Sequence, residues 1–105
     1  MDKQRCVRQA DTFFSASDLS GSGVEQSVRT VSDLAGFFQD DAAYGSMDPN
    51  TVIYTVRAHM PVGPGTVGGL FFGVSLIEAG SVGKEYFMTK GHFHQIPDRG
   101  EYYWG

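Results

Sequence analysis

The sequence predicts an all-β domain with one short helix near the N-terminus. Three observations support this fold class: glycine occurs 14 times, aromatic residues make up 13% of the 105 residues, and apolar and polar residues alternate through residues 51–60. Frequent glycine favours tight turns, whereas aromatic residues and a period of two favour strands. A chain of this length allows one domain.

The first strand and turn are predicted within residues 1–26, which we expect to be an N-terminal extension. Phe13 and Phe14 are adjacent aromatic residues that favour a short strand. Ser-Gly-Ser-Gly at residues 20–23 favours a turn.

The short helix is predicted within residues 27–44. Leu34, Phe37 and Phe38 follow the spacing of one helix face, and Ser32 is the expected N-cap.

Asp40 and Asp41 follow this predicted helix. Neighbouring residues on a helix point in different directions, so we expect two solvated carboxylates and not a catalytic pair.

Two longer strands are predicted after a turn at residues 47–50. The first covers residues 51–60 and places His59 on the same face as Arg57, so His59 is expected to be a surface or edge histidine. The second covers residues 70–77.

Gly63, Gly65 and Gly68 spell G-x-G-x-x-G in the loop between these two strands. That motif binds dinucleotides only where it joins a strand to a helix, so we interpret it here as a hairpin connection. A further turn at residues 78–81 and a strand at residues 85–88 are predicted after it.

Composition excludes several classes of protein. Lys plus Arg number 8 and Asp plus Glu number 12, so the net charge of −4 argues against nucleic-acid binding. No apolar stretch is long enough to span a membrane, so no membrane partner is expected. Cys6 is the single cysteine, which excludes an intrachain disulfide and fits a cytoplasmic protein.

The strongest candidate for chemistry lies near the C-terminus. His92 and His94 would face the same side of a strand, about 6.6 Å apart along it. Glu101 follows Pro97 and Gly100, which favour a chain reversal, so a hairpin would bring its carboxylate beside the imidazoles. This donor set suits Fe(II), Mn(II), Zn(II) or Ni(II), whereas the structural alternative is two partly buried histidines on a β-hairpin. The neighbouring lysine, Lys90, is expected to point to solvent.

The residues around these histidines resemble a known family. The run VGKEYFMTKGHFH at residues 82–94 is similar to the cupin-type glucose-6-phosphate isomerases of archaea and some bacteria, as are Asp98-Arg99 and Glu101-Tyr102-Tyr103. The resemblance extends over about residues 24–105 through four further segments: Ser27-Val28-Arg29, Ser32-Asp33-Leu34, Gly36-Phe37-Phe38 and Val52-Ile53-Tyr54.

The resemblance implies a cupin-type barrel, also called a double-stranded β-helix or jelly roll. It implies an isomerase of glycolysis and gluconeogenesis that interconverts glucose 6-phosphate and fructose 6-phosphate. The implied metal ligands are His92, His94 and Glu101, with Fe(II) as the expected ion and Mn, Zn or Ni as alternatives. Glu101 would be the catalytic base of an enediolate route, or only a ligand in a hydride shift.

The resemblance also implies five contacts to the sugar phosphate, from Tyr54, Ser75, Thr89, Gly91 and Tyr103. Thr89 and Gly91 match positions that hold the phosphate, and the two tyrosines match substrate-lining positions. Ordinary structural roles remain open, because Ser75 and Thr89 can be plain strand residues and Tyr54 can be barrel core.

The chain ends at Gly105, directly after the first cupin metal motif at residues 89–105. We therefore expect residues 1–105 to form a single, incomplete cupin domain, the N-terminal half of the family fold, completed by a homodimer. Two alternatives are a non-catalytic module that binds a metal or a sugar phosphate and another cupin metalloenzyme, such as an Fe(II) dioxygenase.

Overall fold

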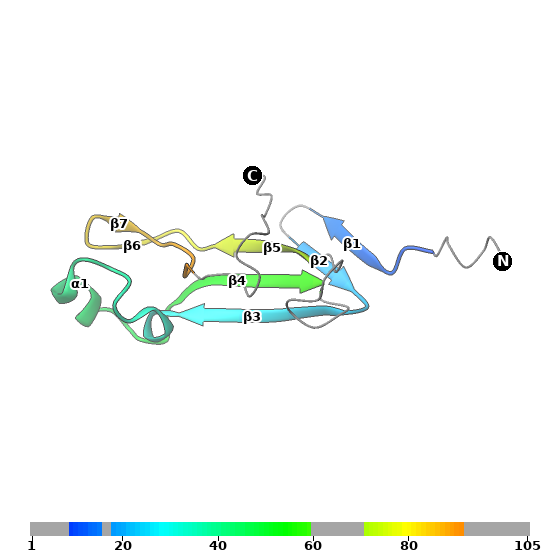
Figure 1. Cartoon of the computed structure of the whole chain (residues 1–105). Helices are drawn as coiled ribbons and strands as arrows, with labels where there is room; N and C mark the ends of the chain where they lie inside the picture. The colour runs from blue at the N-terminus through cyan, green and yellow to red at the C-terminus, as the bar shows by residue number, and fades with distance from the viewer. Residues whose placement is uncertain (1–8, 16–17, 60–70, 92–105) are drawn as a thin grey trace, which may run out of the picture.

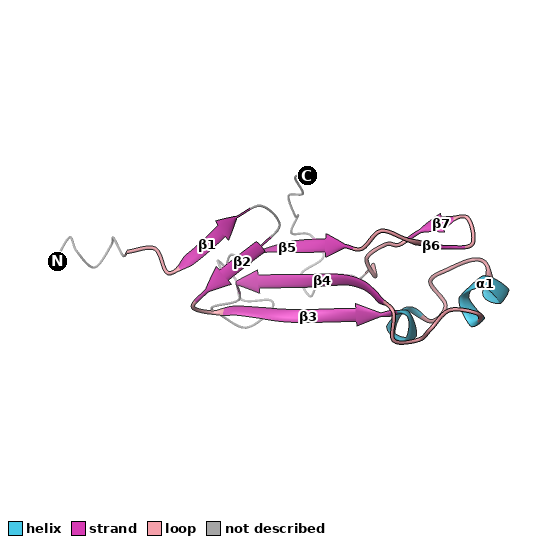
Figure 2. Cartoon of the chain, turned by 180° about the vertical axis from the view of Figure 1, so that it is seen from behind, coloured by secondary structure: helices cyan, strands magenta, loops and turns pink. Residues whose placement is uncertain are grey.

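A computed structural model describes residues 9–15, 18–59 and 71–91 of the chain. Antiparallel strands dominate it, and the helices are short (Figures 1 and 2). The elements in chain order are β1 (Thr12–Ser15), β2 (Asp18–Gly21), β3 (Val24–Thr30), the 3-10 helix η2 (Val31–Leu34), α1 (Asp41–Gly45), β4 (Val52–His59), β5 (Phe72–Ile77), β6 (Ser81–Val82) and β7 (Glu85–Tyr86).

The described strands form three separate sheets. The order β3-β4-β5 makes the central sheet, and β1-β2 and β6-β7 form one hairpin each. Figures 1 and 2 place β1-β2 at one end of the central sheet and α1 with β6-β7 at the other. The predicted β-rich class with a short helix is therefore confirmed. Closure into a cupin barrel and the division of the chain at residue 26 stay predictions.

Antiparallel pairing gives the central sheet two distinct faces, because successive residues of a strand point to opposite sides. The first, called the Tyr54 face below, carries Glu25, Ser27, Arg29, Tyr54, Val56, Ala58, Gly73, Ser75 and Ile77. The second, called the Arg57 face, carries Val24, Gln26, Val28, Thr55, Arg57, His59, Phe72, Val74 and Leu76.

The buried core lies at the end of the sheet where β4 begins. Its members come from the segment after β3, from the first residues of β4 and from β6, and they are Val31, Leu34, Phe38, Ile53, Tyr54 and Val82. Ile53 and Tyr54 point to opposite faces yet are only 0% and 6% exposed. Both faces of the sheet are therefore covered at this end, which fixes the backbone of β4 around Tyr54.

The helix predicted within residues 27–44 differs in type and position in the structure. Residues 31–34 form a 3-10 helix that begins after Thr30, so Ser32 is not its N-cap. The Asp33 carboxylate accepts hydrogen bonds from the Thr30 backbone N–H at 2.9 Å and from the Thr30 hydroxyl at 3.1 Å. Gly36 has φ +84°, which a right-handed helix cannot accommodate, so the helical turn ends before Phe37.

Asp40 and Asp41 are exposed, as predicted. The Asp40 carboxylate also has a structural role that sequence reasoning missed, because it accepts a hydrogen bond from the Ala43 backbone N–H at 2.9 Å. An aspartate in this position caps the N-terminus of α1.

Most predicted strands and turns agree with the structure. β1 contains Phe13 and Phe14, and Ser22 and Gly23 connect β2 to β3. β4 and β5 fall within the predicted strands at residues 51–60 and 70–77. The loop at residues 61–69 lies outside the described residues.

The turn at residues 47–50 is confirmed by two hydrogen bonds. The Thr51 N–H donates to the Asp48 carbonyl at 3.1 Å, and the Asn50 N–H donates to the Asp48 carboxylate at 2.9 Å.

His59 is half-buried and does not lie on an edge strand, contrary to the prediction. β4 pairs with β3 on one side and β5 on the other, which places His59 between Val24 and Phe72. Its imidazole stacks on the Phe72 ring with 4.8 Å between centroids. The prediction was wrong because a histidine at the end of an alternating run can belong to a central strand.

The hairpin β6-β7 explains the VGKE run at residues 82–85. Gly83 and Lys84 form the two-residue turn, and Gly83 has the positive φ of +61° that such a turn requires. Glu85 accepts a hydrogen bond from the Gln39 N–H at 2.6 Å, so the hairpin docks beside α1. The strand predicted at residues 85–88 ends at Tyr86, two residues earlier than expected.

Across the described ranges, no helix is long and apolar enough to cross a membrane.

Candidate functional site

Four of the eight predicted site residues belong to the described part of the chain: Tyr54, Ser75, Thr89 and Gly91. The other four, His92, His94, Glu101 and Tyr103, lie outside the described residues. The four described residues are all predicted sugar-phosphate contacts, and two of them, Thr89 and Gly91, belong to the segment directly before His92.

Tyr54 and Ser75 lie on the same face of the central sheet. Tyr54 pairs with Ile77 and Val56 pairs with Ser75, so the two candidate residues are diagonal neighbours on β4 and β5. Tyr54 is buried, whereas Ser75 is exposed. The register thus places a fixed phenol and an accessible hydroxyl side by side on the Tyr54 face.

A long-range hydrogen bond brings the residues before His92 to this face. The Lys90 backbone N–H donates to the Tyr54 hydroxyl oxygen, with 3.3 Å between nitrogen and oxygen. Figures 1 and 2 show the segment after β7 returning to the start of β4 and the end of β5. Thr89 and Gly91 flank Lys90 and are both exposed. The structure therefore brings Thr89 and Gly91 to Tyr54 at the start of β4, and Ser75 lies on the same face two residues before Ile77, the cross-strand partner of Tyr54.

The Lys90 side chain is exposed, as predicted, and it also has a partner within the chain. Its ammonium nitrogen lies 5.4 Å from the centroid of the Phe37 ring. This distance is typical of a cation–π interaction. Sequence reasoning missed the contact because nothing in the local pattern links the two residues.

Positive charge gathers at the same end of the sheet. Arg29 is exposed and is the cross-strand partner of Tyr54. The hydrogen bonds from Thr30 lower the pKa of the Asp33 carboxyl below its usual value, and the nearby charges of Arg29 and Lys90 lower that pKa further. An anionic ligand on the Tyr54 face would meet the Arg29 guanidinium. Sequence reasoning gave Arg29 no role beyond its place in the segment Ser27-Val28-Arg29 that resembles the family.

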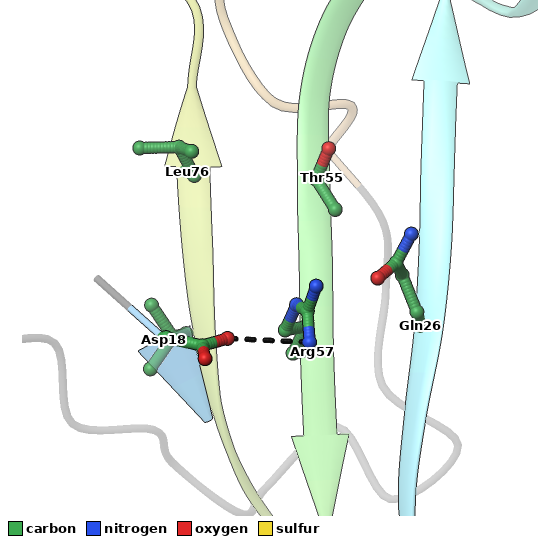
Figure 3. A pocket seen from close by; sticks show the side chains of 6 residues that line it. Asp18, Gln26, Thr55, Arg57 and Leu76 are labelled. Carbon is green, nitrogen blue, oxygen red and sulfur yellow. Dashed lines mark ion pairs between the residues drawn. The ribbon is translucent and has the colours of Figure 1, made fainter. Parts of the chain in front are cut away.

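The opposite face of the sheet carries a different feature. An open groove of about 290 Å³ is lined by Asp18, Gln26, Thr55, Arg57, Val74 and Leu76 (Figure 3). Arg57 forms an ion pair with Asp18, with 3.2 Å between Nη1 and Oδ1 (Figure 3). The paired charges cancel, and none of the predicted site residues lines this groove, so we do not assign the sugar-phosphate site to the Arg57 face.

The ligands implied for a metal are nitrogen and oxygen donors. Two imidazoles and one carboxylate, from His92, His94 and Glu101, match the preferences of borderline divalent ions. The described residues hold no competing group of three histidine, cysteine or acidic side chains. The predicted donor set therefore fits a divalent metal.

Comparisons with known proteins identify one family and several relatives of this chain. The family model described as glucose-6-phosphate isomerase (GPI) matches residues 28–105. The chain is 44% identical over 86 residues to a glucose-6-phosphate isomerase of Thermococcus kodakarensis, covering 79% of this chain and 43% of that protein. It is 43% identical over 76 residues to a glucose-6-phosphate isomerase of Sinorhizobium medicae, covering 70% of this chain and 35% of that protein.

A third relative is the glucose-6-phosphate isomerase of Pyrococcus furiosus, 41% identical over 85 residues, with 77% of this chain and 43% of that protein covered. The chain thus spans about two fifths of the length of these curated relatives. No solved structure matches it significantly. The match to the family covers most of the chain, and the chain belongs to the glucose-6-phosphate isomerase family.

Proposed function

We propose that the chain is a metal-dependent isomerase that interconverts glucose 6-phosphate and fructose 6-phosphate on a cupin-type fold. The family match over residues 28–105 carries this proposal, because that range includes every predicted site residue. The relatives reported above, which cover 70–79% of this chain, are named glucose-6-phosphate isomerase.

The substrate phosphate is proposed to bind on the Tyr54 face, between Ser75 on β5 and the segment 89–91. The Ser75 and Thr89 hydroxyls and the Gly91 N–H are donors that can hold phosphate oxygens without much bulk. The exposed guanidinium of Arg29 on the same face adds an attractive charge for a dianion. The ring of Tyr54 and the side chain of Tyr103 are proposed to line the sugar.

The metal is proposed to be Fe(II), with Mn, Zn and Ni as alternatives, held by His92, His94 and Glu101. When bound, it would supply a positive charge for the sugar oxygens that become negative during the reaction. Glu101 then has two possible roles. In a proton-transfer route it takes the proton from one carbon and returns it to the next. Because a carboxylate that binds a cation is a weaker base, a hydride shift is the alternative. Solvent deuterium found at C1 or C2 of the product would indicate proton transfer.

A homodimer in the cytoplasm is proposed for the working protein. Large apolar side chains remain exposed on the described residues, including Phe13 at 58%, Phe14 at 60% and Phe72 at 45%. Apolar surface of this extent favours association, and a second copy of the chain is the proposed partner.

Metal removal tests the proposed function. The purified chain is treated with a chelator, and fructose 6-phosphate isomerisation is then measured with no addition and with Fe(II) or Mn(II). We expect the chelated chain to show only the buffer rate and the added metal to restore turnover, because both isomerisation routes need a charge beside the sugar oxygens.

Isomerisation that persists after complete chelation would contradict the metal dependence. A chain that neither isomerises nor binds fructose 6-phosphate with any of the four metals would contradict the proposed function itself. Metal-dependent binding without turnover would support a binding module in its place.

A further inference from the structure

Lys90 is held at two points by residues far from it in the sequence. Its backbone N–H donates to the Tyr54 hydroxyl at 3.3 Å, and its ammonium lies 5.4 Å from the centre of the Phe37 ring. One contact fixes the main chain and the other fixes the side chain. The residue between the two proposed phosphate contacts, Thr89 and Gly91, is thereby tied to the rest of the fold.

Tyr54 and Phe37, the two residues that contact Lys90, are themselves fixed by packing and hydrogen bonding. Tyr54 is 6% exposed and packs in the core with Ile53 and Leu34, so its hydroxyl sits on a ring that cannot move freely. Phe37 is 37% exposed, and its N–H donates to the Leu34 carbonyl at 3.1 Å, which ties it to the 3-10 helix. Lys90 thus bridges the central sheet and the helical segment.

We propose that Tyr54 and Phe37 are positioning residues that hold Lys90 so that Thr89 and Gly91 meet the substrate phosphate. We call the three residues Tyr54, Phe37 and Lys90 the Lys90 clamp. This inference rests on the proposed function, since it assigns the clamp to the phosphate end of the same site. It also gives Lys90 a structural task, although a lysine at this point would otherwise be taken for a phosphate ligand.

The Lys90 clamp leads to a specific kinetic prediction. Loss of a clamp contact would displace the Thr89 and Gly91 donors from the substrate phosphate. The phosphate group itself is not changed in the reaction. We expect these contacts to act equally in the ground state and the transition state, so their loss should raise KM and leave kcat nearly unchanged. Inhibition by inorganic phosphate should weaken in parallel with the rise in KM.

Three single variants test the clamp in the full chain. Tyr54→Phe removes only the hydroxyl and should raise KM for fructose 6-phosphate by about threefold to tenfold, the range expected for one hydrogen bond. Phe37→Leu and Lys90→Met should each raise KM by about twofold to fivefold, the range expected for an exposed cation–π pair. The double variant Phe37→Leu/Lys90→Met should match either single variant, because both changes remove the same contact.

Matched controls separate positioning from a general loss of stability. Tyr44→Phe also removes a hydroxyl that hydrogen-bonds the main chain, but its partner is the Val31 carbonyl, at 2.6 Å, and not Lys90. Lys84→Met and Phe71→Leu alter exposed residues of the same types, and Phe71 is 37% exposed like Phe37. All three controls should leave KM and the inhibition by phosphate unchanged. A KM that stays constant in the clamp variants, or rises as much in Tyr44→Phe, would overturn the proposal.

Amide hydrogen exchange gives a readout that does not need activity. The Lys90 N–H should exchange more slowly in the unaltered chain than in Tyr54→Phe, because only the former offers it an acceptor. Equal exchange rates would show that the clamp itself is absent. Slow exchange of the Lys90 N–H in a chain that neither isomerises nor binds sugar phosphate would show that the hydrogen bond exists. It would also show that the hydrogen bond does not serve substrate binding.

Discussion

Glu101→Gln is expected to lower kcat for fructose 6-phosphate isomerisation by about 10³-fold, within the range known for lost acid–base groups. Glutamine has the same size as glutamate but carries no charge, so it is a weak ligand for a divalent ion and no base. The variant therefore removes both proposed roles of the residue. The rate is measured at saturating substrate with added Fe(II) or Mn(II), and bound metal is measured in the same samples.

Glu25→Gln is the matched control, since Glu25 is exposed at the far end of the sheet from the Tyr54 hydroxyl. It should keep full activity. If Glu101→Gln loses its metal and excess metal restores turnover, Glu101 acts as a ligand. If it keeps its metal without turnover, Glu101 acts as the base. Both roles would be contradicted if Glu101→Gln, without excess metal in the buffer, kept its full metal content and a kcat within tenfold of the unaltered chain.

Leu34→Ala is expected to lower the free energy of unfolding by about 3 kcal/mol, the usual cost of emptying a buried leucine site. Leu34 is 0% exposed and packs in the cluster that also buries Val31, Ile53 and Val82. The measurement is urea unfolding followed by circular dichroism at 25 °C.

Leu76→Ala provides the comparison, because Leu76 lies on β5 and is 44% exposed. It should lower the free energy of unfolding by less than about 1 kcal/mol, since nearly half of its surface still faces water in the folded chain and no enclosed cavity would be left. Equal losses in the two variants would contradict the position of the core at the start of β4.

Two of the three strands of the central sheet could be predicted, β4 from the alternating polarity of its residues and β5 from its apolar run, whereas β3 at Val24–Thr30 was missed. β4 and β5 each fall inside the range that these patterns indicate. The helix was predicted less well, because spacing alone does not separate an α-helix from a 3-10 turn followed by a bend. Gly36 ends the turn, so Phe37 leaves the core while Leu34 and Phe38 remain buried.

The candidate site was only partly predictable from the sequence. The resemblance to a family named the residues, but it gave no reason for Tyr54 and Thr89 to lie together. That reason is a hydrogen bond between Lys90 and Tyr54, which are 36 residues apart and joined by no local pattern. The position of Ser75 could not be predicted either. Ser75 shares a face with Tyr54 because of the register in which β4 and β5 pair, and the sequence alone does not give that register.

The most direct test of the proposed site is a map of where fructose 6-phosphate binds. Two-dimensional ¹H–¹⁵N spectra of the metal-loaded chain are recorded during a titration with the sugar phosphate. We predict that the amide signals of Ser75, Thr89 and Gly91 shift together with one dissociation constant, while those of Gln26 and Arg57 stay in place. Shifts confined to the groove around Arg57, or no shifts at all at saturating ligand, would contradict a substrate site on the Tyr54 face.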